Sequence, residues 1–86
     1  MEQEIKALIK KHYKSATVYQ VVLEKSVLNT NDDVVYIKCV AGRNYPNIAL
    51  RILNRYPSVR MVQFTGGWVE AVYTRETLRW AGYKVK

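Results

Sequence analysis

The sequence has few of the residues that would form a disulfide, a zinc site or a membrane span. It contains one cysteine, Cys39, and one histidine, His12, among 86 residues. A single cysteine cannot form an internal disulfide, and structural zinc needs a cluster of Cys and His ligands. No apolar run approaches the roughly 20 residues of a membrane helix, and the first residues alternate charged and apolar side chains, unlike a signal peptide. We therefore expect a cytoplasmic domain with no metal, cofactor or membrane segment.

Groups that perform catalysis are also scarce. Acid–base catalysis usually needs paired carboxylates or a histidine with an orienting partner. His12 lies on the apolar side of a lysine-rich helix, so it is predicted to be a packed residue rather than an acid, a base or a ligand. Asp32 and Asp33 lie in a polar turn and are predicted to be turn formers rather than a metal site. The sequence thus predicts a protein that is not an enzyme.

The composition predicts one ordered domain over residues 1–86. Apolar residues make up 49% of the chain, and only four glycines and two prolines interrupt it. Disordered chains have a lower apolar content, because they cannot bury enough surface to offset the loss of conformational entropy on folding. A chain of 86 residues is long enough for one modest hydrophobic core.

The second half of the chain, residues 47–74, predicts a helix followed by a β-hairpin. Ile48, Ile52 and Tyr56 recur at every fourth position of Asn47–Tyr56, which places them on one stripe of a helix. The strands are Val59–Thr65 and Trp68–Thr74, joined by Gly66-Gly67 as a two-residue turn. With Thr65 opposite Trp68, the predicted core face carries Phe64, Val69, Val62 and Ala71. The other face carries Trp68, Thr65, Gln63, Glu70, Met61 and Val72.

The first half, residues 4–40, predicts the same order of elements. A helix over Glu4–Tyr13 has an apolar stripe, and the strands Ala16–Leu28 and Val34–Val40 follow it. Pairing Leu28 with Val34 places Glu24 opposite Lys38 as a cross-strand ion pair. The predicted core face then carries Val21, Leu23, Val27, Val35, Ile37 and Cys39, with Cys39 as a small buried residue.

The two halves match when one is shifted by 43 residues onto the other. Five of 17 positions are then identical: Ile5 and Ile48, Ile9 and Ile52, Tyr13 and Tyr56, Ser15 and Ser58, and Gln20 and Gln63. Either an internal duplication or a common packing demand explains this pattern. A third helix follows the second hairpin, capped by Thr74 and ended by Gly82. Its apolar contacts are assigned to Leu78 and to either Trp80 or Ala81.

These elements predict an α+β fold in the order α-β-β-α-β-β-α, with an internal α-β-β repeat over residues 4–40 and 47–74 as one interpretation. The predicted sheet has four strands, is mainly antiparallel and carries the helices on one face. The order of the strands stays open, because two hairpins can meet through different edges.

Charge is the main indication of a partner. The chain has 14 Lys and Arg against seven Asp and Glu, a net charge of +7. Such a surplus attracts polyanions, and it favours DNA or RNA as the partner. Two rows at helical spacing carry it, one of Lys6, Lys10 and Lys14 and one of Arg51 and Arg55. Side-by-side packing of the two helices is expected to merge these rows into one phosphate-binding surface.

The open face of the sheet offers two further interpretations. Tyr36 and Trp68 beside Lys38 are predicted to stack on the bases of a single strand. Alternatively, Trp68, Met61, Tyr36 and Val72 form the centre of a protein interface, because aromatic residues and Met are enriched there. In that case the partner is a second copy or an acidic protein, docked on the sheet face or on an edge strand.

Overall fold

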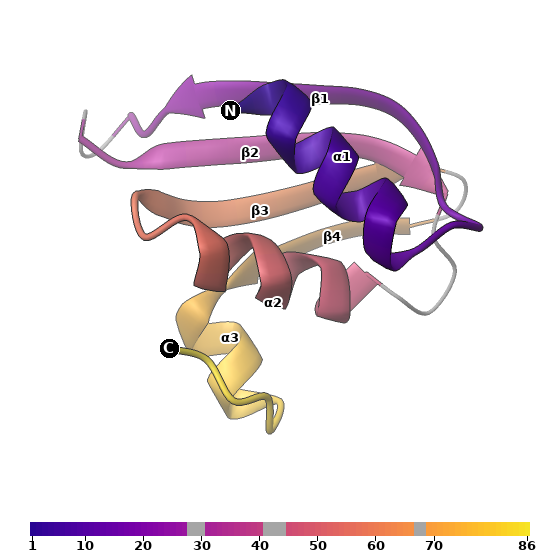
Figure 1. The fold of residues 1–86 in the computed structure, drawn as a ribbon. Coiled ribbons are helices and arrows are strands. Elements are labelled where there is room, and N and C mark those ends of the chain that lie inside the picture. Colours follow the sequence, from indigo (N-terminus) through magenta and orange to yellow (C-terminus); the bar gives the residue numbers. More distant parts are fainter. Residues whose placement is uncertain (28–30, 41–44, 67–68) are drawn as a thin grey trace.

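The structure is a computed structural model, and it describes residues 1–27, 31–40, 45–66 and 69–86, apart from the side chain of Val69. The described elements are three helices and four strands (Figure 1). In chain order they are α1 (Glu2–His12), β1 (Thr17–Lys25), β2 (Asp33–Val40), α2 (Tyr45–Arg55), β3 (Val59–Gly66), β4 (Val69–Thr74) and α3 (Arg75–Trp80). The predicted α+β class and element order are confirmed.

The four strands form one mixed sheet in the order β1-β2-β3-β4. The pairs β1–β2 and β3–β4 are antiparallel, whereas the central pair β2–β3 is parallel. The prediction of a mainly antiparallel sheet is therefore wrong. The physical reason is α2, which connects β2 to β3 as a crossover and returns the chain to the end of the sheet where β2 began.

Both hairpins keep their predicted core faces but not their predicted registers. Glu24 pairs with Val34, four residues before the expected Lys38, so the predicted Glu24–Lys38 pair is wrong. Thr65 pairs with Glu70, two residues beyond the expected Trp68. Because side chains alternate between faces, a shift by an even number of residues leaves each side chain on the same face. Val27, which was assigned to the core, lies beyond the end of β1 and is fully exposed.

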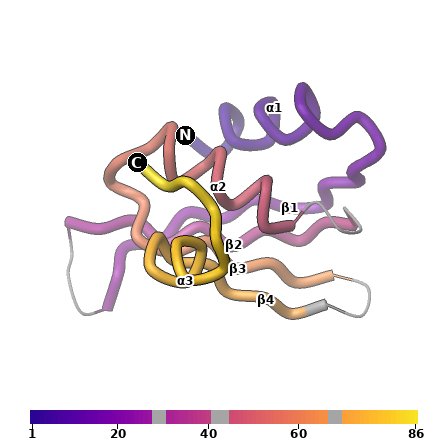
Figure 2. The backbone as a smooth tube through the Cα atoms, turned by 90° about the horizontal axis from the view of Figure 1, so that it is seen from below, coloured from indigo at the N-terminus to yellow at the C-terminus, as the bar shows by residue number. Residues whose placement is uncertain are grey.

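The two longer helices, α1 and α2, lie on the same face of the sheet (Figures 1 and 2). The core fills the space between these helices and the strands. Ile5 and Ile9 of α1 are buried in it, as are Val35 and Ile37 of the central strand β2. The remaining buried apolar residues of this cluster are Ala16, Val18, Cys39, Tyr45, Ile48, Ala49, Ile52, Leu53, Val59, Val62, Phe64 and Leu78.

The short helix α3 packs beside α2 at the end of β4. Thr74 caps it, because its side chain accepts a hydrogen bond from the backbone of Thr77, and Thr77 bonds back to Thr74. Leu78 is buried as predicted, whereas Trp80 is 92% exposed and Ala81 is also exposed. The predicted apolar contacts of α3 are thus right for Leu78 and wrong for Trp80 and Ala81.

Polar side chains join the elements at one end of the sheet, where β1 ends and β2 and β3 begin. We call this the polar end, and it comprises Lys25, Asp33, Ser58 and Arg75. The buried carboxylate of Asp33 accepts hydrogen bonds from Lys25 Nζ and from Ser58 Oγ at 2.8 Å. Asp33 therefore does more than form a turn, because it ties β1 to the residue before β3.

The guanidinium of Arg75 closes the same end from the side of α2. It donates to the carbonyl oxygens of Val59 at 2.5 Å, Leu53 at 2.7 Å and Tyr56 at 3.3 Å. The last carbonyls of a helix have no partner within that helix, and a cation is favoured there. Arg75 thus caps the end of α2 and holds it against the start of β3.

At the opposite end of the sheet, β2 and β3 approach closely. A Cβ atom at Gly66 would lie 2.2 Å from the carbonyl oxygen of Cys39, so this position requires glycine. The hydroxyl of Tyr45 donates to the same carbonyl at 2.9 Å.

The structure does not show an internal repeat. β1 lies at an edge of the sheet and β3 in its centre, so the two halves do not occupy equivalent positions. None of the helices in the described part of the chain is long and apolar enough to cross a membrane.

Candidate nucleic-acid interface

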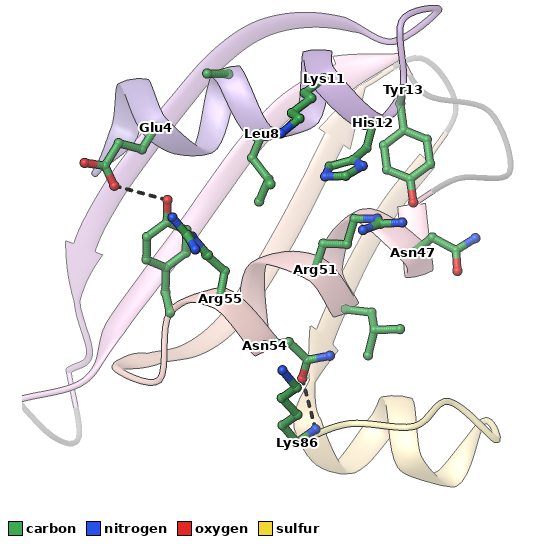
Figure 3. Close-up of a pocket in the computed structure, with 13 residues that line it drawn as sticks. Glu4, Leu8, Lys11, His12, Tyr13, Asn47, Arg51, Asn54, Arg55 and Lys86 are labelled. Carbon is green, nitrogen blue, oxygen red and sulfur yellow. Dashed lines mark hydrogen bonds between the residues drawn. The ribbon is translucent and has the colours of Figure 1, made fainter.

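A hollow of about 1130 Å³ lies on the helical face of the molecule, between α1 and α2 and over the exposed side of α2 as far as Lys86 (Figure 3). We call it the groove. Its lining comes from both helices and from the C-terminal residue. The lining residues are Glu4, Ala7, Leu8, Lys11, His12, Tyr13, Asn47, Leu50, Arg51, Asn54, Arg55, Tyr56 and Lys86.

The positions of these residues follow from the helical repeat. Ile5 and Ile9 turn one side of α1 to the core. Leu8, Lys11 and His12 are three and four residues apart and so share the flank of α1 that faces α2. On α2, Arg51 and Arg55 are one turn apart and face the groove in the same way.

Cations dominate the polar lining of the groove. Lys11, Arg51 and Arg55 are exposed, and Lys86 adds a fourth cation from the C-terminal segment. Of the described residues that line the groove, only Glu4 is acidic. Across the described part of the chain the single ion pair is between Lys25 and Asp33, outside the groove. No cation of the groove therefore forms an ion pair with another described residue.

The pKa of His12 is lowered by its surroundings. Partial desolvation is the largest cause, and the neighbouring cations Arg51 and Lys11 act in the same direction. His12 is exposed and lines the groove, so the prediction that it packs into the core or its boundary is wrong. A histidine beside two cations gains a proton more readily when an anion enters the site.

Glu4 and Tyr56 close one end of the groove. The hydroxyl of Tyr56 donates to Glu4 Oε2 at 3.2 Å, a bond that joins α1 to the end of α2 (Figure 3). Burial and this carboxylate raise the pKa of the Tyr56 phenol. At the other end of the groove, His12, Tyr13 and Arg51 lie near one another.

The structure separates the two predicted rows of cations. Arg51 and Arg55 line the groove, but Lys6, Lys10 and Lys14 do not. Lys6 and Lys10 lie on the flank of α1 away from α2, and Lys10 Nζ donates to the carbonyl of Ala16 at 2.7 Å. The prediction that the two rows merge is wrong, because Lys11 rather than the predicted lysines faces α2.

Neither α1 nor α2 covers the opposite face of the sheet. Three rows of its side chains cross all four strands, because directly paired residues point to the same side. The rows are Glu24, Val34, Met61 and Thr74; Val22, Tyr36, Gln63 and Val72; and Gln20, Lys38, Thr65 and Glu70. Tyr36 and Lys38 are thus on this face as predicted, and Trp68 lies outside the described residues. The described face carries two acids and one base, so it is not basic.

Cys39 has the buried position that the sequence predicts. Burial raises the pKa of its thiol to about 11, which keeps it protonated at neutral pH. No group of three or more His, Cys, Asp and Glu side chains among the described residues could hold a metal ion.

Comparison of the chain with protein-family models, curated proteins and solved structures finds no match. A function can therefore be proposed only from the geometry of the molecule, and the groove is the feature used below. Of the lining residues, sequence reasoning assigned only Arg51 and Arg55 to a binding surface, and it missed the other two cations, Lys11 and Lys86. Lys11 could have been found, because it lies three residues after Leu8 on the flank of the helix. Lys86 carries no such signal, since its position depends on the C-terminal segment folding back, where Lys86 N donates to Asn54 Oδ1 at 3.0 Å.

Proposed function

We propose that this protein binds nucleic acid without catalysing a reaction, and that the phosphates of the ligand enter the groove between α1 and α2. One observation carries this proposal: cations from three segments of the chain line one hollow, in which Glu4 is the only acidic side chain among the described residues. A protein gains no stability from holding like charges together, since neighbouring cations repel one another. Their convergence is therefore better explained by a polyanionic ligand.

Phosphate contacts of this kind have a measurable signature. Each phosphate that a cation neutralises releases condensed counterions, so the logarithm of the binding constant falls linearly with the logarithm of the salt concentration. The slope reports the number of contacts, at about 0.7 per phosphate for single strands and about 0.9 for duplexes. This makes the groove testable residue by residue.

The test is fluorescence anisotropy of labelled DNA and RNA of mixed sequence, titrated with protein at several salt concentrations. The double variant Arg51→Gln with Arg55→Gln removes two groove cations, so the slope should become shallower by about 1.4–1.8. The matched control is Lys6→Gln with Lys14→Gln, which removes the same charge outside the groove. The control variant should change the slope by less than about half of the change in the groove variant, because charges far from the bound phosphates are largely screened.

Two results would overturn the proposal. One is the absence of binding even at low salt. The other is an equal effect of the groove variant and the control variant, which would mean that binding follows net charge and not the groove. Circular dichroism of all variants ensures that only folded proteins are compared.

A second candidate function, homodimerisation, is favoured by the uncovered face of the sheet. Val22, Tyr36, Met61 and Val72 are only partly covered there, although each carries a large side chain. We propose a second copy as the partner. Two such faces can pack against each other with little charge repulsion, and the basic helical faces then lie on the outer surfaces of the dimer, farthest apart.

Analytical ultracentrifugation over a range of concentrations tests the dimer. Val72→Glu places a charge on the face and should shift the protein to monomer, whereas Val27→Glu, at a fully exposed position beyond β1, should not. A monomer at all concentrations would exclude this candidate, as would a dimer that Val72→Glu leaves intact.

A further inference from the structure

We propose that the groove binds a single strand of nucleic acid in preference to a duplex. This inference rests on the proposed function and specifies the form of its ligand. Three observations support it: the side of each helix on which the cations lie, the dimensions of the hollow, and the rings at one of its ends.

The cations of α2 face inward. Arg51 and Arg55 lie on the flank of α2 toward α1, whereas Asn47 and Asn54, which also line the groove, lie opposite the buried stripe of α2 and form its outermost ridge. These outermost positions are uncharged. A duplex is usually contacted by a protruding element, such as a helix that enters the major groove, which is about 12 Å wide. The ridge of α2 has no cation that could contact the phosphates of a duplex approaching in this way.

On α1 the outermost positions are also uncharged. Gln3 and Ala7 lie opposite the buried Ile5 and Ile9, while Lys11 lies closer to the flank that faces α2. A rigid duplex resting on the two ridges would meet neutral side chains on both helices. A single strand is narrow enough to pass between the ridges and to reach the cations on both walls.

The size of the hollow fits a short piece of one strand. Each of the two helices has 11 residues, which corresponds to a length of about 16 Å at 1.5 Å per residue. The volume of about 1130 Å³ lies slightly above the range of pockets for drug-sized ligands, roughly 300–1,000 Å³. The hollow is therefore large for one phosphate and suits a few linked nucleotides.

The lining also includes groups that recognise bases. His12 and Tyr13 provide rings at one end of the groove beside Arg51, and Leu8 provides an apolar surface between the helices (Figure 3). Unpaired bases expose faces that stack on aromatic rings, whereas the faces of paired bases are covered by their neighbours in the duplex. This combination of rings with cations matches the chemistry of single-strand binding.

The experiment compares single-stranded oligonucleotides of two to twelve nucleotides with duplexes of the same sequences, by anisotropy competition at one salt concentration. We expect single strands of four nucleotides or more to bind at least tenfold more tightly than a duplex. Inorganic tripolyphosphate carries the charge without bases and should compete more weakly than an oligonucleotide of comparable charge. Polyglutamate should compete weakly too, because it offers carboxylates but no bases.

Variants of the ring at position 13 locate the base contact. Tyr13→Leu should weaken single-strand binding by roughly tenfold, the scale of one lost stacking contact, and should leave duplex binding unchanged. Tyr13→Phe keeps the ring and should bind single strands like the native protein. The control is Tyr19→Leu, which removes a ring that is 60% exposed on β1, outside the groove, and should have no effect.

The outcomes separate this inference from the proposed function. Equal binding of single strands and duplexes, with the salt slope still dependent on Arg51 and Arg55, would overturn the preference for single strands and leave the nucleic-acid proposal intact. An unchanged affinity of Tyr13→Leu for single strands would also overturn it. No binding of either form would overturn both, and competition by polyglutamate as strong as by oligonucleotides would point instead to an acidic protein partner.

Discussion

The polar end of the sheet and the groove between the helices contain the same kinds of charged side chain but differ in how these side chains are paired. At the polar end, each charge has a partner within the protein: Lys25 pairs with Asp33, and Arg75 is bound by backbone carbonyls. In the groove, Lys11, Arg51 and Arg55 have no carboxylate paired with them among the described residues. Net charge alone therefore does not identify a surface that is open to an anionic ligand. What matters is which cations the fold leaves unneutralised.

The largest expected effect is at the polar end. Arg75→Ala should lower the free energy of unfolding by about 2–4 kcal/mol, because hydrogen bonds to a charged group contribute roughly 1.5–3 kcal/mol and the freed carbonyls lose their donor. Urea denaturation followed by circular dichroism measures this change. Arg79→Ala is the matched control on the same helix, since Arg79 is exposed and makes one long bond, to the carbonyl of Lys86 at 3.4 Å.

Because Arg75 belongs to the polar end and not to the groove, we also expect that it does not contribute to oligonucleotide binding. At a temperature where Arg75→Ala is fully folded, its affinity for oligonucleotides should equal that of the native protein within about twofold. A loss of affinity as large as that of the groove variants would show that the polar end and the groove are not separate in function.

Asp33→Asn should have the next largest effect, a loss of roughly 1–3 kcal/mol, because Lys25 and Ser58 then lose a charged acceptor. These two hydrogen bonds lower the pKa of Asp33 in the folded state. A lowered pKa means that the stabilisation is present above the unfolded value of 3.8 and is lost as the pH falls through the folded value.

The pH dependence provides the check on Asp33. Denaturation midpoints measured between pH 2 and 7 should fall more steeply below pH 4 for the native protein than for Asp33→Asn. The neighbouring Asp32→Asn serves as the control, because Asp32 makes no corresponding side-chain bonds to Lys25 and Ser58. If the denaturation midpoints of the native protein and of Asp33→Asn fall in parallel with decreasing pH, Asp33 is not the cause of the acid sensitivity.

A smaller effect is expected from the one acid that lines the groove among the described residues. Glu4→Gln removes a negative charge near Arg55 and Tyr56 and should tighten oligonucleotide binding about threefold, the size of one weak surface interaction. Anisotropy at low salt measures it. Glu2→Gln is the control on the same helix, outside the groove lining, and tighter binding by that variant to the same extent would mean that only net charge is being measured.

The smallest predicted effect concerns pH and His12. The pKa of His12 lies below its usual 6.5, so the imidazole is largely neutral at pH 7 and gains its charge only as the pH falls. A protonated ring adds a cation to the groove, and affinity should therefore rise about two- to threefold from pH 7.5 to pH 5.5. His12→Gln should show a flat profile over that range at constant ionic strength, and a rise as large as in the native protein would exclude His12 as the cause.

Much of the fold could be predicted from periodicity, but the long-range pairing could not. Both longer helices were predicted from their apolar stripes, Ile5 and Ile9 in α1 and Ile48 and Ile52 in α2, because a helix is indicated by the local spacing of its apolar residues. The hairpin registers failed, since they depend on where each turn closes. The parallel pair β2–β3 was missed although a signal existed: a strand, a helix and a second strand in succession favour a crossover.

Two of the four cations that line the groove among the described residues were predicted from the sequence. Arg51 and Arg55 were identified because helical spacing places them together, and their flank happens to face α1. Lys6, Lys10 and Lys14 were chosen by the same rule, yet spacing alone does not say which flank of α1 faces α2. The contact between Asp33 and Ser58 could not be predicted from local spacing either, because the two residues are 25 positions apart in the sequence.

The parallel pairing of β2 with β3 has a consequence for the route by which the chain folds. Each hairpin closes locally, since Lys25 pairs with Asp33 and Gly66 with Val69. The central pair instead joins Val35 to Val62, so its formation closes the long connection that contains α2. Contacts distant in sequence carry a larger entropic cost of loop closure and slow folding. We therefore expect the docking of α2 to lie in the rate-limiting step, with the two hairpins formed earlier and joined last.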